Sequence, residues 1–235
     1  MTDWNSVFDG ILTERQFKVN EPMNRHNTYG IGGPADVFVM PQTEDQLKQV
    51  LRRADELHIP VTVIGGGSNS LISDRGIRGI TLCTARIKSS TVRKGNQIIV
   101  TGGAGTGAVS RFAMKEGLSG LEFAAGIPGT SLGAVFMNAN GYGSKFANVV
   151  HSVRTVTRDG RQEKHYTLEE IQYGDSDSVF MHNGDIVLEV VFDLKEGNPE
   201  EIKAVMDEYQ ASRRAKQPLE KRSAGTMFLR PPGHY

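Results

Sequence analysis

The sequence predicts an α+β fold made of two successive regions, and three observations carry this prediction. A β-α-β unit spans residues 35–64, three glycine-rich loops surround it, and strands dominate from residue 150 onward. A chain of 235 residues is long enough for one or two domains with a real core. Glycine is frequent, at 27 residues, but the apolar content is normal, so these glycines indicate shaped loops on an ordered scaffold.

The first region contains the β-α-β unit. Thr43 followed by Gln46 is a capping-box pattern, which predicts a helix start between the two strands. Such a unit usually forms a parallel pair of strands with a right-handed crossover. The expected elements are a helix over 5–20, a strand over 36–40, a helix from 44 to about 57, and a strand over 61–64.

The second region alternates strands with helices. Asp159-Gly160 is a hairpin turn signal between two of its strands. No convincing element is predicted over 217–235. Over the whole chain beyond residue 64, the expected strands are 79–83, 90–93, 97–101, 149–158, 162–167 and 185–194, and the expected helices are 106–116, 132–137 and 199–216.

The charge balance excludes partners that are recognised through overall charge. Lys and Arg number 27, as do Asp and Glu, so the net charge is zero. We therefore expect no nucleic-acid or membrane partner, and any phosphate binding must be local. The start of the chain lacks a signal pattern, and no apolar run approaches the roughly 20 residues of a membrane helix. The expectation is a cytoplasmic monomer.

Cysteine and histidine give no sign of a metal site. Cys83 is the single cysteine, which excludes an internal disulfide and a multi-cysteine metal site. The six histidines show no i, i+4 pairing and no carboxylate spacing typical of ligands. We therefore expect no bound metal.

The glycine loop after the strand over 61–64 is the most informative segment for chemistry. The strand stops at Gly65, Gly66 and Gly67, and Ser68 and Asn69 follow with polar side chains. Glycines lack a Cβ and reach positive φ, so consecutive N–H groups can converge on an anion. The loop is either a phosphate cradle for a nucleotide or a tight turn between two strands.

Two further glycine-rich segments accompany this loop. In residues 126–143, Pro128-Gly129 is a turn and the apolar run over 132–137 predicts a buried helix. That helix start either faces a pyrophosphate or is an ordinary helix N-terminus followed by a loop. Residues 27–36 form the third segment, which leads directly into the first predicted strand.

Taken together, these segments resemble the bacterial UDP-N-acetylenolpyruvoylglucosamine reductases (MurB). The resemblance covers roughly residues 20–235 and holds in order and spacing. It is carried by Asn27-Thr28…Gly32-Gly33-Pro34-Ala35, by Gly65-Gly66-Gly67-Ser68-Asn69, by Gly126-Ile-Pro-Gly129…Gly133-Ala134…Met137-Asn138-Ala139…Tyr142-Gly143, and by Lys216-Gln-Pro218…Ser223-Ala-Gly-Thr-Met-Phe…Arg230-Pro-Pro-Gly233.

The resemblance implies the FAD-binding fold of the vanillyl-alcohol oxidase and MurB type, with FAD between two α+β subdomains. The implied bounds are 1–86 and 87–215 for the subdomains and 216–235 for the start of a truncated substrate-binding domain. In the family, NADPH reduces FAD, and the flavin then reduces the enolpyruvyl group of a UDP-sugar, which gives UDP-N-acetylmuramate for peptidoglycan. The alternative is a MurB-like FAD-binding protein that has lost this reductase activity.

The resemblance also assigns residues to the site. Lys216 matches the lysine that binds the substrate diphosphate, a point-charge role that lysine suits. Tyr142 and Arg230 are further substrate residues. FAD is expected to contact Asn27, Thr28, Gly65, Gly66, Gly67, Ser68, Asn69, Gly126, Ile127, Pro128, Gly129, Thr130, Gly133, Ala134 and Asn138.

Three departures from the family bear on catalysis. Thr226 stands where the family has a serine or cysteine proton donor, so it is the candidate donor here, with an added methyl group. Ser176, between Asp175 and Asp177, stands at the arginine of the motif Tyr-Arg-x-Ser, which removes a positive charge expected to stabilise the substrate carboxylate. The chain ends before the family's catalytic glutamate, and a truncated form of a working reductase would explain that ending.

Two other charged groups have simpler interpretations. The Asp175 and Asp177 pair is typical of an exposed polar turn. A basic run near the end of the last predicted helix is typical of a solvated helix face, and only Lys216 in it is predicted to be functional. The run comprises Arg213, Arg214, Lys216, Lys221 and Arg222.

Overall fold

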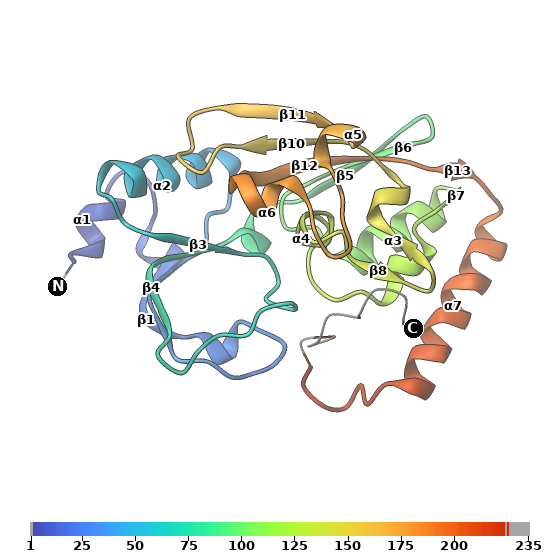
Figure 1. Ribbon diagram of the computed structural model, residues 1–235, viewed down its shortest axis with the longest axis horizontal. Helices are drawn as coiled ribbons and strands as arrows, with labels where there is room; N and C mark the ends of the chain where they lie inside the picture. The colour runs from blue at the N-terminus through green and yellow to red at the C-terminus, as the bar shows by residue number, and fades with distance from the viewer. Residues whose placement is uncertain (1, 224, 226–235) are drawn as a thin grey trace.

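Two sheets, one after the other along the chain, form the scaffold of the protein (Figure 1). The computed structural model describes residues 2–223 and residue 225. The first sheet has the order β1-β2-β4-β3, and the second has the order β11-β10-β12-β6-β5. Their strands are β1 (Phe17–Pro22), β2 (Pro34–Val39), β3 (Val61–Ile64), β4 (Ile77–Cys83), β5 (Ser90–Lys94), β6 (Gln97–Thr101), β10 (Val150–Val156), β11 (Glu163–Thr167) and β12 (Ile186–Asp193).

Helices and short strands complete the structure. Two short pairs, β7 (Leu118–Ser119) with β13 (Lys195–Glu196) and β8 (Asn140–Gly141) with β9 (Ser144–Lys145), lie outside the main sheets. In the described part of the chain, no helix has both the length and the apolar character needed to span a bilayer. The α-helices are α1 (Trp4–Phe8), α2 (Glu44–Glu56), α3 (Thr106–Lys115), α4 (Ser131–Phe136), α5 (Leu168–Ile171), α6 (Val179–Asn183) and α7 (Pro199–Lys216).

The β-α-β unit is present, but its two strands do not pair with each other. Strand β4 lies between β2 and β3 and is parallel to both, with Val37 opposite Ile80 and Val63 opposite Leu82. The last five residues of β4 are all buried, as expected for the central strand of a parallel sheet that is covered on both faces. The expectation of a direct pair between the strands of this unit was therefore wrong.

The predicted helix over 5–20 was also wrong beyond its first turns. Helix α1 ends at Phe8, Gly10 adopts a φ of +71°, and residues 17–22 form β1, which runs antiparallel to β2. The apolar residues that suggested a helix do reach the core, because the Phe17 ring packs against Phe8 at 5.2 Å between centroids. Their spacing came from a short helix, a turn and a 3-10 helix (Glu14–Gln16) that lead into a strand, which the pattern of apolar residues cannot distinguish from one continuous helix.

Helix α2 confirms the predicted helix start. The Thr43 hydroxyl accepts a hydrogen bond from the Gln46 N–H at 3.2 Å. The Gln46 side chain accepts from the Gln42 N–H at 2.9 Å rather than from Thr43, so only half of the capping box forms. The buried stripe of this helix is Leu47, Val50, Leu51 and Ala54.

The second sheet is antiparallel throughout and confirms the strands predicted over 90–93, 97–101, 149–158, 162–167 and 185–194. The strand predicted over 79–83 is β4 of the first sheet. Residues of β6, β10 and β12 form one hydrophobic core with α3 and α4. Val156, Ile186 and Leu188, from the end of β10 and from β12, belong instead to the core of the first region. Because one core draws on both regions, the bounds 1–86 and 87–215 stay a prediction.

Arg154 on β10 joins the two regions through charge. Its guanidinium donates two hydrogen bonds to the Glu44 carboxylate at the start of α2, at 3.0 and 3.1 Å. It also lies 3.1 Å from Glu163 on β11 and 3.6 Å from Glu189 on β12. Burial acts to lower the pKa of Arg154, but these carboxylates outweigh it and raise the pKa further above its ordinary value.

Replacing Arg154 tests this connection. The Arg154 side chain is 16% exposed, and Arg154→Leu leaves the three carboxylates around it without their cation. We therefore expect a loss of roughly 3 kcal/mol in the free energy of unfolding. Urea denaturation measures this loss. Arg53→Leu is the control, because it removes an exposed pair within α2 that is worth less than about 1 kcal/mol.

The same experiment has a defined pH dependence. Lys48 and Arg154 lower the pKa of Glu163 in the folded protein, and their effect outweighs burial, which acts to raise it. A lowered folded pKa stabilises the protein fully above the unfolded pKa, and that stabilisation is lost as the pH falls through the folded pKa. The loss in the free energy of unfolding caused by Arg154→Leu should therefore become smaller as the pH falls. A deficit that is equal at all pH values would contradict the ionic origin of the connection.

Candidate functional site

A cleft of about 1470 Å³ lies where β3 ends and is the candidate functional site. One wall is the glycine loop over 65–70, and a second is formed by residues from 127 to 142 around α4. The third wall consists of the last turns of α7 and the segment over 217–223, which runs from α7 back toward the first sheet (Figure 1). The cleft is therefore built by both regions of the chain.

The glycine loop is shaped by close contact with two other loops. A Cβ on Gly65 would lie 2.7 Å from the Thr130 hydroxyl, and one on Gly66 would lie 2.9 Å from the Gly129 Cα. A Cβ on Gly67, whose φ is +67°, would lie 2.0 Å from the carbonyl oxygen of His26. The three glycine-rich segments of the sequence thus meet at one place. Because side chains are excluded there, the floor of the cleft is bare backbone.

Polar contacts hold the same three segments together. The Thr28 N–H donates to the Gly67 carbonyl at 3.3 Å, and the Ser68 hydroxyl donates to the Pro128 carbonyl at 3.1 Å. The loop joins two parallel strands, β3 and β4, which cannot be connected by a tight hairpin turn. The alternative of a tight turn between adjacent strands therefore does not apply.

The structure brings most of the predicted site residues that it describes into the cleft. Asn27, Gly126, Gly129 and Asn138 do not line it, and Thr226 and Arg230 lie outside the described residues. The binding roles of all these residues stay predictions. Those that line the cleft are Thr28, Gly65, Gly66, Gly67, Ser68, Asn69, Ile127, Pro128, Thr130, Gly133, Ala134, Tyr142 and Lys216.

Asn27 and Asn138 use their amides to shape loops. The Asn27 amide donates to the carbonyls of Met23 and Ile31 at 2.6 and 2.8 Å. Asn138 is 1% exposed, donates to the Gly174 carbonyl at 2.8 Å, and accepts from the Ala147 N–H at 2.9 Å. Both side chains therefore fix the backbone of loops near the cleft and do not line it.

Several cations that line the cleft were not predicted to be functional. Arg213, Lys221 and Arg222 line it together with Lys216, whereas the basic run was interpreted as a solvated face. The Arg222 guanidinium donates to the Gly30 carbonyl at 3.1 Å, which places this segment against the first region. Glu220 is the single carboxylate of the described lining, so this wall carries a net positive charge. The i, i+3 spacing of Arg213 and Lys216 on a predicted helix could have revealed their common face.

Ser176 also lines the cleft, with a φ of +54°. Asp177 beside it accepts from the His182 ring at 3.0 Å, and this contact lowers the pKa of Asp177. The Gly174 N–H donates to the Asp177 carbonyl at 3.0 Å, so these residues form a turn, as predicted. The turn presents the Ser176 hydroxyl to the cleft where the resemblance implies an arginine, and the Asp177 carboxylate, which does not line the cleft, contacts His182 instead.

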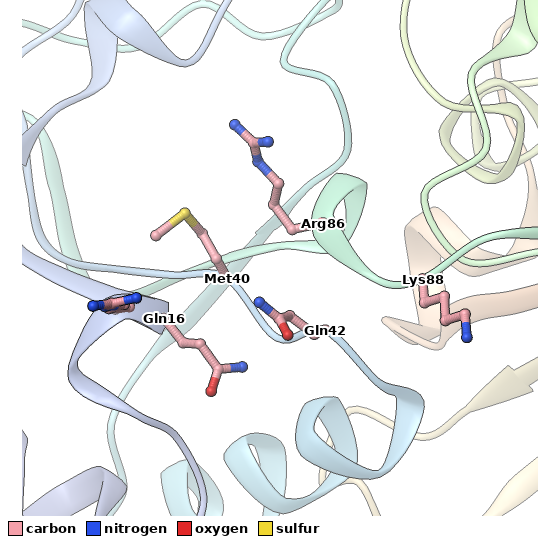
Figure 2. Close-up of a pocket in the computed structure, with 6 residues that line it drawn as sticks. Gln16, Met40, Gln42, Arg86 and Lys88 are labelled. Atoms are coloured by element: carbon pink, nitrogen blue, oxygen red, sulfur yellow. The ribbon is translucent and has the colours of Figure 1, made fainter.

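A second, smaller cavity of about 420 Å³ lies at the carboxyl end of β2 (Figure 2). Its Gln16 amide is already used, because it donates to the Gln46 side chain at 2.8 Å. None of the predicted site residues that the structure describes lies in it. The lining consists of Arg15, Gln16, Met40, Gln42, Arg86 and Lys88.

Comparison with known proteins bears on both the fold and the site. Residues 35–165 match the family model described as an FAD binding domain. The chain is 45% identical over 225 residues to the UDP-N-acetylenolpyruvoylglucosamine reductase of Geobacillus thermodenitrificans, which covers 96% of this chain and 73% of that protein.

Solved structures agree with this match. The crystal structure of UDP-N-acetylenolpyruvylglucosamine reductase (MurB) from Thermus caldophilus superposes with a TM-score of 0.73 at 30% identity, over 94% of this chain and 76% of that chain. The 4-ethylphenol oxidase from Gulosibacter chungangensis has a TM-score of 0.62 at 13% identity, over 81% of this chain and 42% of that chain, which indicates a shared fold alone. The predicted FAD-binding fold is confirmed.

A pair of glycine substitutions tests the convergence of the loops. Gly67 and Gly95 both have positive φ, but a Cβ meets the His26 carbonyl at Gly67 and has no atom within 4 Å at Gly95. Gly95→Ala should therefore destabilise the protein by only about 1 kcal/mol, from the backbone alone. Gly67→Ala should be clearly worse, because the loops must separate. Thermal unfolding compares them, and equal losses would refute the close contact.

Proposed function

This chain belongs to the UDP-N-acetylenolpyruvoylglucosamine reductase family, and we propose that it is itself an FAD-dependent reductase of peptidoglycan precursor synthesis. In this proposal NADPH is the reductant, and the enolpyruvyl group of a UDP-sugar is the group reduced. The cytoplasm, which supplies both small molecules, is the proposed location. The observation that carries the proposal is one cleft formed jointly by three glycine-rich loops and a cationic helix face.

The residues of the cleft fit a dinucleotide such as FAD. The cleft of about 1470 Å³ is larger than the roughly 300–1,000 Å³ of a pocket for one small ligand. Its floor, at Gly65, Gly66 and Gly67, is backbone that no side chain covers, which suits a pyrophosphate. Phe123, Ile127 and Phe136 add apolar surface for rings. When bound, FAD supplies the redox chemistry, taking hydride from NADPH and passing it to the substrate double bond.

The cationic wall gives the protein its part in binding. Arg213 and Lys216 lie on one face of α7 and place positive charge beside the glycine loop. FAD and a UDP-sugar both carry diphosphate groups, so a local positive field favours both, although the chain as a whole is neutral. We assign Lys216 to the substrate diphosphate and Tyr142 to the substrate side of the cleft. Thr226 as proton donor and Arg230 as a substrate residue remain part of this proposal.

A second candidate function is FAD binding without this reductase activity, and Ser176 favours it. Family resemblance implies an arginine at this position to stabilise the substrate carboxylate. The cleft instead contains Ser176, and the carboxylate of the adjacent Asp177, which lies outside the lining, is ionised at neutral pH. A negative field at this point should repel a carboxylate, and the loss of one such charge contact is typically worth a few kcal/mol of barrier.

The visible absorption spectrum of the protein and the rate of NADPH oxidation distinguish the two candidate functions. The purified protein should show the visible absorption of bound flavin, and NADPH with UDP-N-acetylglucosamine enolpyruvate should then be consumed together. Bound flavin with no turnover would favour the second candidate. A protein that does not bind added FAD would refute both.

Substituting Ser176 tests the missing charge directly. Ser176→Arg should raise kcat/KM for the enolpyruvyl substrate by about tenfold or more, because it restores a cation opposite the carboxylate. Ser176→Gln is the matched control, since it adds length and hydrogen-bonding capacity without charge. Steady-state NADPH oxidation measures both variants. Equal effects of the two substitutions would show that size, and not charge, limits this position.

A further inference from the structure

Helix α7 is anchored unevenly along its length. In its first half, Ile202 and Met206 are buried, at 5% and 3% exposure. After Met206, the helix continues for ten residues that include no fully buried side chain. Arg213 and Lys216, the two cations that line the cleft, lie in this second half. Their position therefore depends on some other contact.

One such contact is a stacked pair of aromatic rings, and another is the packing of the Arg213 side chain against Gly126. Tyr142, from the turn between β8 and β9, lies against Tyr209 with 4.2 Å between ring centroids and 5° between ring planes. The Tyr142 hydroxyl donates to the backbone carbonyl of Tyr209 at 2.6 Å. In a regular α-helix this carbonyl pairs with the N–H four residues later, which is that of Arg213. The stack thus contacts the turn of α7 that directly precedes Arg213 and Lys216.

The turn that carries Tyr142 is a two-residue hairpin turn, and such a turn favours positive φ at both of its central residues. Tyr142 has a φ of +53° and Gly143 a φ of +77°, so the hairpin tip has two successive left-handed residues. An aromatic residue in this region is unfavourable by roughly 1–2 kcal/mol and persists where its surroundings determine it. Here the surroundings are the hairpin of β8 and β9 and, on the side of the ring, Tyr209 and its carbonyl.

We propose that Tyr142 and Tyr209 form a clamp that holds the second half of α7 over the cleft and so positions Arg213 and Lys216 for a diphosphate-bearing ligand. The proposal rests on FAD binding in the cleft, as proposed above, where the positive field of both cations favours the diphosphate of FAD as well as that of the substrate. Both tyrosines are positioning residues, since they act through the two cations. The clamp also means that the Tyr142 hydroxyl is engaged with the protein before any ligand arrives.

The first test measures the clamp without a ligand. Tyr209→Leu removes the stack, Tyr142→Phe removes the hydrogen bond to the helix, and Tyr209→Phe keeps both the ring and the carbonyl as a matched control. Hydrogen exchange over residues 207–216 should lose protection in the first two variants and remain unchanged in the control. Unchanged protection in all three variants overturns the clamp.

The second test asks whether the clamp acts through the cations. The dissociation constant of FAD, measured by flavin fluorescence with the apoprotein, should rise about tenfold in Tyr209→Leu and stay near the wild-type value in Tyr209→Phe. In an Arg213→Met, Lys216→Met background, Tyr209→Leu should have little further effect, because coupled residues are not additive. A full additional loss in that background overturns the positioning role.

The two tests separate this proposal from the proposed function. If the wild-type protein does not bind FAD, the proposed function is refuted, and the positioning role falls with it. If FAD binds and exchange is lost in Tyr209→Leu without any change in FAD affinity, the positioning role alone is overturned. Loss of protection together with a coupled loss of FAD affinity supports both.

Discussion

Contact between the backbones of three loops is the constraint on which the rest of the structure depends. Gly66 lies against Gly129, and Gly67 lies against the carbonyl of His26, at distances that leave no room for a Cβ. These approaches bring the end of β3 from the first region to the start of α4 from the second. The cleft is the space left beside this contact, so its shape follows from glycine placement more than from any single polar side chain.

Charge is arranged locally around this neutral chain. Arg154 holds α2 against the second sheet through Glu44, and Glu163 and Glu189 on neighbouring strands complete an ion-pair network in which both signs of charge are paired. The cleft wall at α7 and 217–223 keeps its cations largely unopposed, since Glu220 is its one described carboxylate. Although the net charge is zero, charged residues have two different roles here. One group connects the two regions of the chain, and the other creates a positive field that attracts anions to the cleft.

Local patterns predicted much of this structure, and long-range pairing explains what they missed. Strand and helix periods were sufficient for β2, α2, β10 and α7, because these elements alternate or repeat regularly. Nothing local indicates that β4 inserts between β2 and β3, since strand order depends on contacts across the chain. The glycine loops were predicted by composition. Lys216 was predicted, but Arg213, Lys221 and Arg222 were missed because the other walls of the cleft lie on distant segments, and a basic run by itself is typical of solvated surface.

The central position of β4 has a consequence for how the protein acquires its structure. Strands β2 and β3 flank a strand that is translated after both of them, so the β-α-β unit over 35–64 has no completed sheet of its own. The loop over 65–76 can reach its final conformation only when β4 pairs with β2 and β3. Formation of the glycine loop is therefore coupled to formation of the sheet. Non-local pairing of this kind slows folding. The first region is thus a poor unit for transplantation or for cutting near residue 65, because either change separates the loop from the strand that seats it.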